Sequence, residues 1–257
     1  MSRMVIFGLG YTASRIAAAL RERGWQVDAT GSAGNLDFDD EPAIRAALAN
    51  VTHVLSSVPP FENSDPVLDR YNNALKRGWT GYLSSTGVYG DTGGAWVDES
   101  APAGLGRRAA RADCDQRWLD KGAHVFRLPG IYGPGRNPLE RVRDGKAKRI
   151  NVPGQLFNRI HVDDIISSVL ASFTGPAGVF NITDDVPAAQ HEVLAYAARL
   201  LGIEAPPLIS LEDANLSKVA MGFYEENRKV TNGKAKRELN WQPQFTDYKM
   251  GLSDLLD

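Results

Sequence analysis

The sequence has a single cysteine, no long apolar run and no excess of basic charge. Cys114 stands alone among 257 residues, so no internal disulfide can form, and a cytoplasmic protein is expected. No run of about 18 apolar residues occurs, so no membrane-spanning helix is expected. The first residues lack the basic segment of a secretion signal. Lysine and arginine total 29 against 31 acidic residues, so a nucleic-acid partner is not expected either.

What is present is ordinary globular composition, with 43% hydrophobic and 23% charged residues. The first half alternates short apolar strands with amphipathic helices, and this alternation predicts an α/β protein with a parallel sheet. We expect strands at residues 4–7, 25–30, 53–58, 79–84 and 124–127, and helices at residues 11–23, 41–49, 66–76 and 107–121.

The regular alternation of strand and helix patterns ends after residue 134. Short strand patterns at 149–152, 179–182 and 208–211 mix with helical patterns at 164–173, 188–201 and 232–239. We therefore predict a Rossmann-type doubly wound parallel sheet over residues 1–134, with returning segments from the C-terminal half. Residues 135–257 are predicted to form a smaller α+β substrate-binding lobe at the carboxyl edge of the sheet, where open α/β sheets bind ligands.

A glycine turn follows the first predicted strand. Residues 7–13 read FGLGYTA, a G-x-G-x-x-A pattern between a strand and a helix. Gly8 makes the tight turn, Gly10 lets the backbone approach a pyrophosphate, and Ala13 allows close helix packing. The backbone of Leu9, Tyr11 and Thr12 offers N–H groups to the phosphates. The pattern predicts a site for NAD or NADP; the alternative is a plain strand–helix turn with incidental glycines.

The end of the second strand distinguishes NAD from NADP only weakly. Residues 29–34 read ATGSAG and contain neither the acidic residue that holds a ribose hydroxyl nor an arginine for a 2′-phosphate. Asp28 lies too early, and Ser32 can donate to a phosphate, so NADP is slightly favoured and both stay open. The stretch from Ser32 to Asp37 is too short for a crossover helix. We expect that helix to be missing or reduced and the adenosine side to be open.

Four segments together resemble the short-chain dehydrogenase/reductase superfamily. The segments are SSTGVYGD at 84–91, RLPGIYGPGR at 127–136, RIHVDD at 159–164 and VFNI at 179–182. With the glycine turn, they resemble the extended, NAD(P)-dependent epimerase/dehydratase-like branch over nearly the whole chain. The resemblance implies a dinucleotide cofactor and a fold with a substrate-binding C-terminal lobe.

The resemblance also implies roles for individual residues. Ser85 matches the catalytic serine, and Thr86 beside it is a candidate to position a substrate; the alternative is that these hydroxyls bind the loop backbone. Implied cofactor contacts lie along one sheet edge, with Asp37 and Phe38 near the adenine, Ser57 and Val58 lining the cleft, and Pro129, Gly130 and Ile131 near the nicotinamide.

One motif of the family is missing. Typical members carry Y-x-x-x-K on the helix after V-Y-G, but here Arg107 stands at the tyrosine position and Arg111 at the lysine position. No tyrosine occurs between residues 107 and 121. Arginine stays charged and transfers protons poorly, so the usual acid/base chemistry is in doubt. Arg111 is predicted to contact cofactor ribose or phosphate, and Arg107 an anionic substrate group; the alternative is a solvated helix face.

Other candidates compete with structural explanations. Tyr132 is a candidate replacement acid/base and Tyr89 a candidate substrate contact, although both also suit packing under a loop. Arg159 is a candidate substrate contact. The HVDD run at residues 161–164 contains metal-ligand types, but Asp163 or Asp164 as a helix N-cap explains it more simply, so no metal is expected.

These observations favour an NAD(P)-dependent oxidoreductase or epimerase/dehydratase-like enzyme. It would act on a small polar substrate by hydride transfer, with a non-standard acid/base. The alternative is a non-catalytic NAD(P)-binding sensor or scaffold, and a vestigial fold that binds other proteins is a third hypothesis. Because relatives pair through helices like those at 66–76 and 107–121, a homodimer is also predicted.

Overall fold

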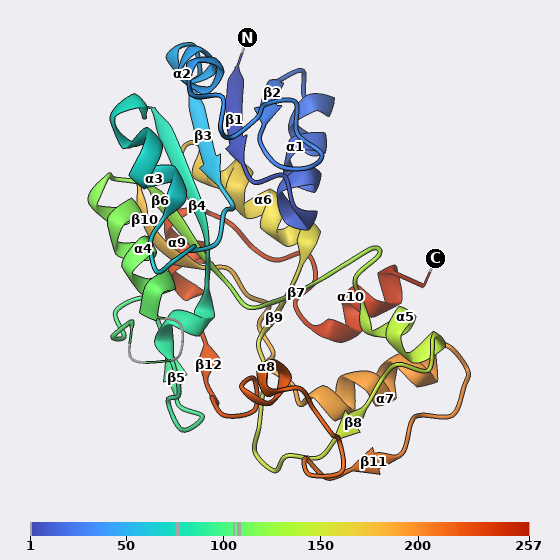
Figure 1. Cartoon of the computed structure of the whole chain (residues 1–257). Helices are drawn as coiled ribbons and strands as arrows, with labels where there is room; N and C mark the ends of the chain where they lie inside the picture. Colours follow the sequence, from blue (N-terminus) through green and yellow to red (C-terminus); the bar gives the residue numbers. More distant parts are fainter. Residues whose placement is uncertain (1, 76–77, 105, 107–108, 257) are drawn as a thin grey trace.

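A six-stranded parallel sheet forms the centre of the computed structural model, which describes residues 2–75, 78–104, 106 and 109–256 (Figure 1). The spatial order is β2-β1-β3-β4-β6-β10, with every neighbouring pair parallel. The strands are β1 (Arg3–Phe7), β2 (Gln26–Ala29), β3 (His53–Ser56), β4 (Trp79–Ser85), β6 (His124–Leu128) and β10 (Gly178–Asn181). Because all are parallel, their carboxyl ends meet at one edge. The predicted Rossmann-type α/β fold is confirmed.

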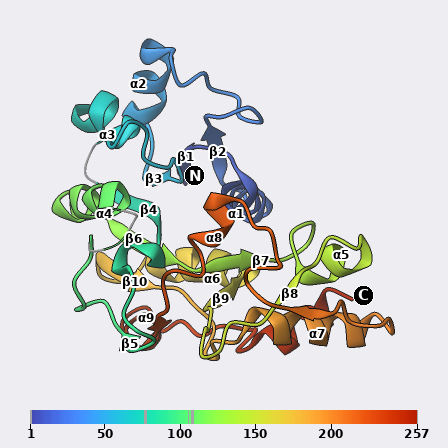
Figure 2. The same cartoon turned by 60° about the horizontal axis from the view of Figure 1, so that its bottom comes forward.

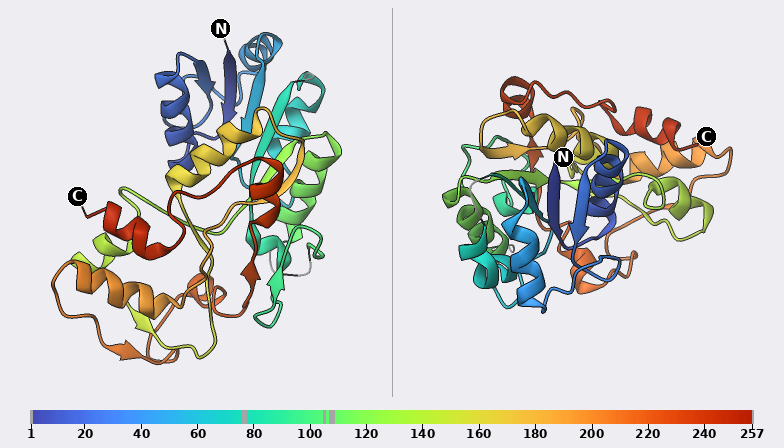
Figure 3. Two further views of the ribbon diagram at one scale, coloured as in Figure 1. Left: turned by 180° about the vertical axis from the view of Figure 1, so that it is seen from behind. Right: turned by 90° about the horizontal axis from the view of Figure 1, so that it is seen from above.

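Helices cover both faces of this sheet. α1 (Tyr11–Glu22), α6 (Val162–Ser172) and α9 (Gly233–Glu238) share a core with one face, and α1 and α6 lie in front of the sheet when seen from behind (Figure 3). α2 (Glu41–Ala49), α3 (Pro66–Tyr71) and α4 (Ala109–Asp120) pack on the other face. Ile16 and Leu20 of α1 are fully buried, and each such side chain contributes about 1.5–3 kcal/mol of transfer free energy.

The connection after β2 contains no helix, as its small number of residues predicts. Residues 31–35, all of which the structure describes, form turns and bends rather than a helix. One parallel bridge between Thr30 and Leu36 stands where a third strand would run, and the chain continues directly into α2. The expectation of a missing crossover helix is confirmed.

Helix starts follow capping chemistry, with one correction. The Asp40 side chain accepts from the Ala43 N–H at the start of α2, and Asp65 caps α3 in the same way. The expected Asp163 or Asp164 cap of α6 is wrong, because the helix begins at Val162 and His161 is its N-cap. Asp164 is buried and instead accepts from the backbone N–H groups of Gln244 and Phe245, at 2.6 and 3.1 Å.

The rest of the C-terminal half packs separately below the sheet edge. α5 (Pro138–Arg143), α7 (Gln190–Leu200) and α10 (Tyr248–Asp254) share one core, flanked by the parallel pair β8 (Arg149–Ile150) and β11 (Leu208–Ile209). Figure 2 shows α5 and α7 together, on the side away from α2 and α3. The strand predicted at 179–182 is β10 and belongs to the large sheet, not to this part.

Shorter elements connect these parts. A 3₁₀ turn at Asn72–Ala74 ends the helix predicted over 66–76, and a second 3₁₀ turn, η2, covers Thr86–Tyr89. The short helix α8 covers Lys218–Met221. Two parallel strand pairs complete the set: β7 (Gly130–Tyr132) with β9 (Arg159–His161), and β5 (Trp96–Val97) with β12 (Lys229–Val230). Within the described ranges, no helix has both the length and the apolar character required to cross a bilayer.

Candidate functional site

The glycine turn lies at the carboxyl edge and is held from both sides. Gly8 has a φ of +84°, a conformation that disfavours side chains, and its N–H donates to the Thr30 Oγ1 at 3.1 Å. The Leu9 N–H donates to the Thr30 carbonyl at 2.8 Å. On the other side the Ser57 hydroxyl donates to the Gly8 carbonyl at 3.0 Å. The ends of β2 and β3 therefore fix the turn before any ligand binds.

The start of α1 is open toward a ligand. A Cβ built on Gly10 would meet nothing within 4 Å, so open space lies above this residue. Gly10 is the N-cap, its position carries no side-chain cap hydrogen bond, and the first turn contains no acidic residue. The first N–H groups of a helix have no partner within the helix, and they attract anions. This arrangement fits a pyrophosphate.

A hollow of about 420 Å³ lies beside the turn, where the adenosine of a dinucleotide is expected. Its lining residues are Gly31, Gly34, Asn35, Leu36, Asp37 and Phe38. The Phe38 ring stands edge-on to Phe7 and Tyr71, with centroids 6.2 and 5.4 Å apart, so its position is set by the core. Asp37 and Ser32 are both exposed. Because the crossover helix is missing, this end is as open as the sequence predicts.

Sequence reasoning missed part of this hollow. Asn35 accepts from the Ala29 N–H at 2.9 Å and donates to the Asp28 carboxylate at 2.8 Å, which closes the loop over the end of β2. A Cβ on Gly34 would lie 2.2 Å from the Ala29 carbonyl oxygen, so the backbone approaches β2 too closely for a side chain. The glycine pair at 31 and 34 was the available signal.

Hydroxyl groups gather where β4 ends. Ser85 is half-buried, and its Oγ accepts from the Gly87 N–H at 3.1 Å, capping η2. Thr86 is only 5% exposed and Ser84 only 6%. The Ser84 hydroxyl is buried with no hydrogen-bond partner among the described residues. Of the three, Ser85 alone offers more than a trace of surface to a ligand.

Arg111 points back onto the sheet. Its Nη1 donates to the Tyr82 hydroxyl at 3.0 Å and to the Leu83 carbonyl at 3.4 Å. Burial raises the pKa of Tyr82, so this phenol holds its proton. Arg107, predicted to contact substrate, lies outside the described residues. Among the described residues at the start of α4, Arg111 therefore provides a fixed positive charge near the end of β4, and its guanidinium does not shuttle protons.

The end of β6 leads to the residues that the sequence predicts beside a nicotinamide. Gly130 is exposed, while Pro129 and Ile131 are half-buried. The Gly130 N–H donates to the Asn158 carbonyl at 3.3 Å, where β7 begins. Val58, at the end of β3, is also half-buried and lies against Gly8. The predicted cofactor contacts thus share one edge of the sheet.

Tyr89 lies in a buried polar network below this edge. Its hydroxyl donates to the Asn181 Oδ1 at 2.8 Å and accepts from the Arg127 Nη1 at 2.9 Å. Arg127 also pairs with Asp115 at 2.6 Å, and both side chains are almost fully buried. Burial raises the pKa of Tyr89. The hydroxyl is thus engaged within the protein, which supports the packing explanation for this residue.

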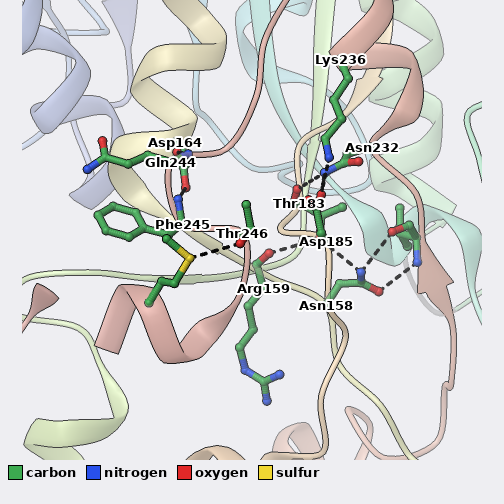
Figure 4. A network of polar contacts seen from close by, with 12 residues as sticks. Asn158, Arg159, Asp164, Thr183, Asp185, Asn232, Lys236, Gln244, Phe245 and Thr246 are labelled. Atoms are coloured by element: carbon green, nitrogen blue, oxygen red, sulfur yellow. Dashed lines mark hydrogen bonds and ion pairs between the residues drawn. The ribbon is translucent and has the colours of Figure 1, made fainter. Parts of the chain in front are cut away.

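Tyr132 and Arg159 are both buried among the segments that join the sheet to the C-terminal part. Tyr132 is 5% exposed, stands edge-on to His161 at 5.2 Å, and has a pKa raised by burial. The Arg159 guanidinium donates to the Phe157 and Ala188 carbonyls, at 2.8 and 2.9 Å. Figure 4 shows this side chain pointing away from the contacts around Asn158 and Asp185. Arg159 therefore joins neighbouring chain segments.

A metal centre has no support in the described ranges. No three or more His, Cys, Asp or Glu side chains there gather as they would around an ion. The Cys114 thiol is buried, and burial raises its pKa to about 11, so it is a poor nucleophile at neutral pH.

Comparison with known proteins agrees with this architecture. No protein-family model matches the chain. It is 27% identical to Protein YeeZ of Escherichia coli (strain K12), over 86% of this chain and 92% of that protein. It is 39% identical to a functionally unknown conserved protein from Silicibacter pomeroyi DSS, with a TM-score of 0.88 over 99% of this chain and 98% of that one.

A third likeness concerns the fold alone. The human epimerase family protein SDR39U1, solved with NADPH, is 17% identical, with a TM-score of 0.77 over 99% of both chains. The chain therefore shares the fold of this epimerase family protein, and the predicted resemblance is confirmed at the level of the fold.

Proposed function

We propose that this chain, which belongs to the same family as the S. pomeroyi protein, is an atypical epimerase/dehydratase-like member of the short-chain dehydrogenase/reductase superfamily. We propose further that it binds NAD or NADP. The open space above Gly10, at an uncapped helix start, carries this proposal. The first turn of α1 would hold the pyrophosphate, and the hollow beside Phe38 would take the adenosine.

Of the two cofactors, we propose that NADP is preferred. The carboxylate nearest the end of β2 is Asp28, which already accepts from Asn35 and lies 3.7 Å from the Arg3 guanidinium. Residues 29–36 contain no acidic side chain, the nearest carboxylate in the hollow is that of the exposed Asp37, and Ser32 is exposed to donate to a 2′-phosphate. An NAD site normally places an acidic residue at this point.

The proposed reaction is oxidation or reduction of a small polar substrate beside Ser85. The dinucleotide supplies hydride chemistry when it is bound. Ser85 donates a hydrogen bond to a substrate oxygen, and the fixed charge of Arg111 favours negative charge near the end of β4. Neither group shuttles protons as a tyrosine–lysine pair does, so the acid/base is non-standard.

A non-catalytic dinucleotide sensor is the second candidate function. The observation that favours it is the engagement or burial of the tyrosines around the edge. Tyr82 and Tyr89 are hydrogen-bonded inside the protein, and Tyr132 is packed below the sheet. NADPH consumption with any carbonyl compound in a broad screen would exclude this alternative.

Calorimetric titration with NADPH and NADH tests the proposal, with Gly10→Val as the diagnostic variant. Because a side chain at Gly10 meets open space, the variant should fold normally, with an unfolding midpoint close to that of the wild type. Its side chain would occupy the pyrophosphate position, so NADPH affinity should fall by at least about 100-fold. Wild-type protein that binds neither dinucleotide, or a variant that binds as well as wild type, would overturn the proposal.

A further inference from the structure

Two segments far apart in sequence meet at the first turn of α1. The Tyr11 hydroxyl donates to the Pro134 carbonyl at 3.0 Å, and the Arg15 Nη2 donates to the same oxygen at 2.6 Å. The Arg15 Cζ lies 4.5 Å from the centroid of the Tyr11 ring, and the Arg136 Cζ lies 5.6 Å from it. The ring therefore has two guanidinium groups beside it, which is a favourable cation–π arrangement.

The backbone fixes this contact. Gly133 and Arg136 exchange two backbone hydrogen bonds of 3.0 Å, which close the turn that carries Arg136. A Cβ on Gly133 would lie 2.8 Å from the Tyr11 hydroxyl and 2.6 Å from the Val162 Cγ1, and its φ is +157°. Only glycine allows the turn to lie so close to α1, so Arg136 is brought to the start of that helix.

The two arginines differ in what holds them. Arg15 is engaged with the Pro134 carbonyl. Arg136 is exposed, and no described residue accepts a hydrogen bond from its guanidinium. The carboxylate of Glu140, in the first turn of α5, already accepts from the Gly135 N–H and the Asn137 amide, at 3.1 and 3.2 Å. A positive group is thus presented at a helix start that lacks acidic residues.

We propose that Arg136, braced by Tyr11 and Arg15, binds a phosphate group at the start of α1. A guanidinium fork matches two phosphate oxygens, and the neighbouring helix N–H groups favour the same negative charge. The phosphate has two sources, the pyrophosphate of the dinucleotide or a phosphorylated substrate lying on the lobe side. The first source rests on the function proposed above.

The test compares Arg136→Gln with the matched control Arg143→Gln, an exposed arginine in the last turn of α5. Each variant removes one charge. NADPH is titrated into each by calorimetry, and inorganic pyrophosphate is titrated into free and NADPH-loaded protein. Arg136→Gln should weaken phosphate binding about tenfold, or about 1.4 kcal/mol, and Arg143→Gln less than about twofold. Tyr11→Phe, which keeps the ring but loses the bond to Pro134, should weaken it by a smaller factor.

The two titrations distinguish the sources. Weaker NADPH binding by Arg136→Gln identifies the cofactor's pyrophosphate. Unchanged NADPH binding, with loss of pyrophosphate binding to the NADPH-loaded protein, identifies a substrate phosphate. If Arg136→Gln matches Arg143→Gln in both titrations, the inference is overturned, while NADPH binding by the wild type would leave the proposed function intact. If the wild type binds no NADPH, the proposed function fails and pyrophosphate binding to the free protein decides the inference alone.

Discussion

Asp184 is a buried carboxylate whose oxygens have no hydrogen-bond partner among the described residues, and its side chain is 2% exposed. Burial raises its pKa well above the ordinary value, while Arg159 opposes the shift and Asp185 and Asp247 add to it. The folded protein holds the Asp184 proton more tightly than the unfolded chain does. Protonated Asp184 therefore contributes its full stability below the pKa that this carboxyl has in the unfolded chain. The contribution is lost as the pH rises through the higher pKa that it has in the folded protein.

Asp184→Asn should therefore stabilise the protein at high pH. Urea unfolding should give a free energy of unfolding about 1–3 kcal/mol higher than wild type at about pH 8.5, with the gain disappearing toward about pH 4. Asp185→Asn is the control, because that carboxylate is exposed and paired with Lys236 at 2.6 Å, so it should give no such gain. An equal loss of stability at both pH values would show that solvent or another group satisfies Asp184.

The ion pair between Asp115 of α4 and Arg127 of β6 ties this helix to the central sheet. The Asp115 and Arg127 side chains are 1% and 6% exposed, and Arg127 also supports Tyr89 at the end of η2. Removing one member leaves a buried charge without its partner, so Asp115→Ala should cost about 3–5 kcal/mol in urea unfolding. The double variant Asp115→Leu with Arg127→Met should cost less than Asp115→Ala alone. If the double variant costs as much as or more than the single one, the pair itself is strongly stabilising.

Local pattern predicted most elements but not their long-range partners. The bounds of α2 match the expectation because Asp40 and Pro42 are local signals. The short connection after β2 followed from counting residues. The start of α6 was misplaced because Asp164 binds backbone groups about 80 residues away, which no local rule contains. The strand predicted at 179–182 was assigned to the lobe for the same reason, since its pairing with β6 joins residues distant in sequence.

For the whole molecule, the sequence predicted that the candidate site residues share the carboxyl edge of the sheet, because strand ends and glycines mark that edge. It did not predict side-chain direction. Tyr132 packs so closely against Gly251 that a Cβ there would lie 2.1 Å from its hydroxyl, a contact across about 120 residues. The homodimer stays a prediction. Arg117 pairs with Asp69 across α3 and α4, and among the described residues the large exposed apolar side chains lie outside these two helices.

Dinucleotide binding should stabilise both parts of the molecule together. The part of the predicted lobe built on α5, α7 and α10 is linked to α1 by the Tyr11 contact with Pro134, which shortly precedes α5 in the chain. At 100 times the dissociation constant, NADPH adds about 2.7 kcal/mol. For a chain of this length, that should raise the thermal midpoint by about 5–10 °C in a single transition. At the same NADPH concentration, Gly10→Val, with an affinity at least about 100-fold lower, should shift by no more than about 1–2 °C. Two transitions, of which NADPH moves only one, would mean that the lobe unfolds independently and that the contact at Pro134 does not couple it to the cofactor site.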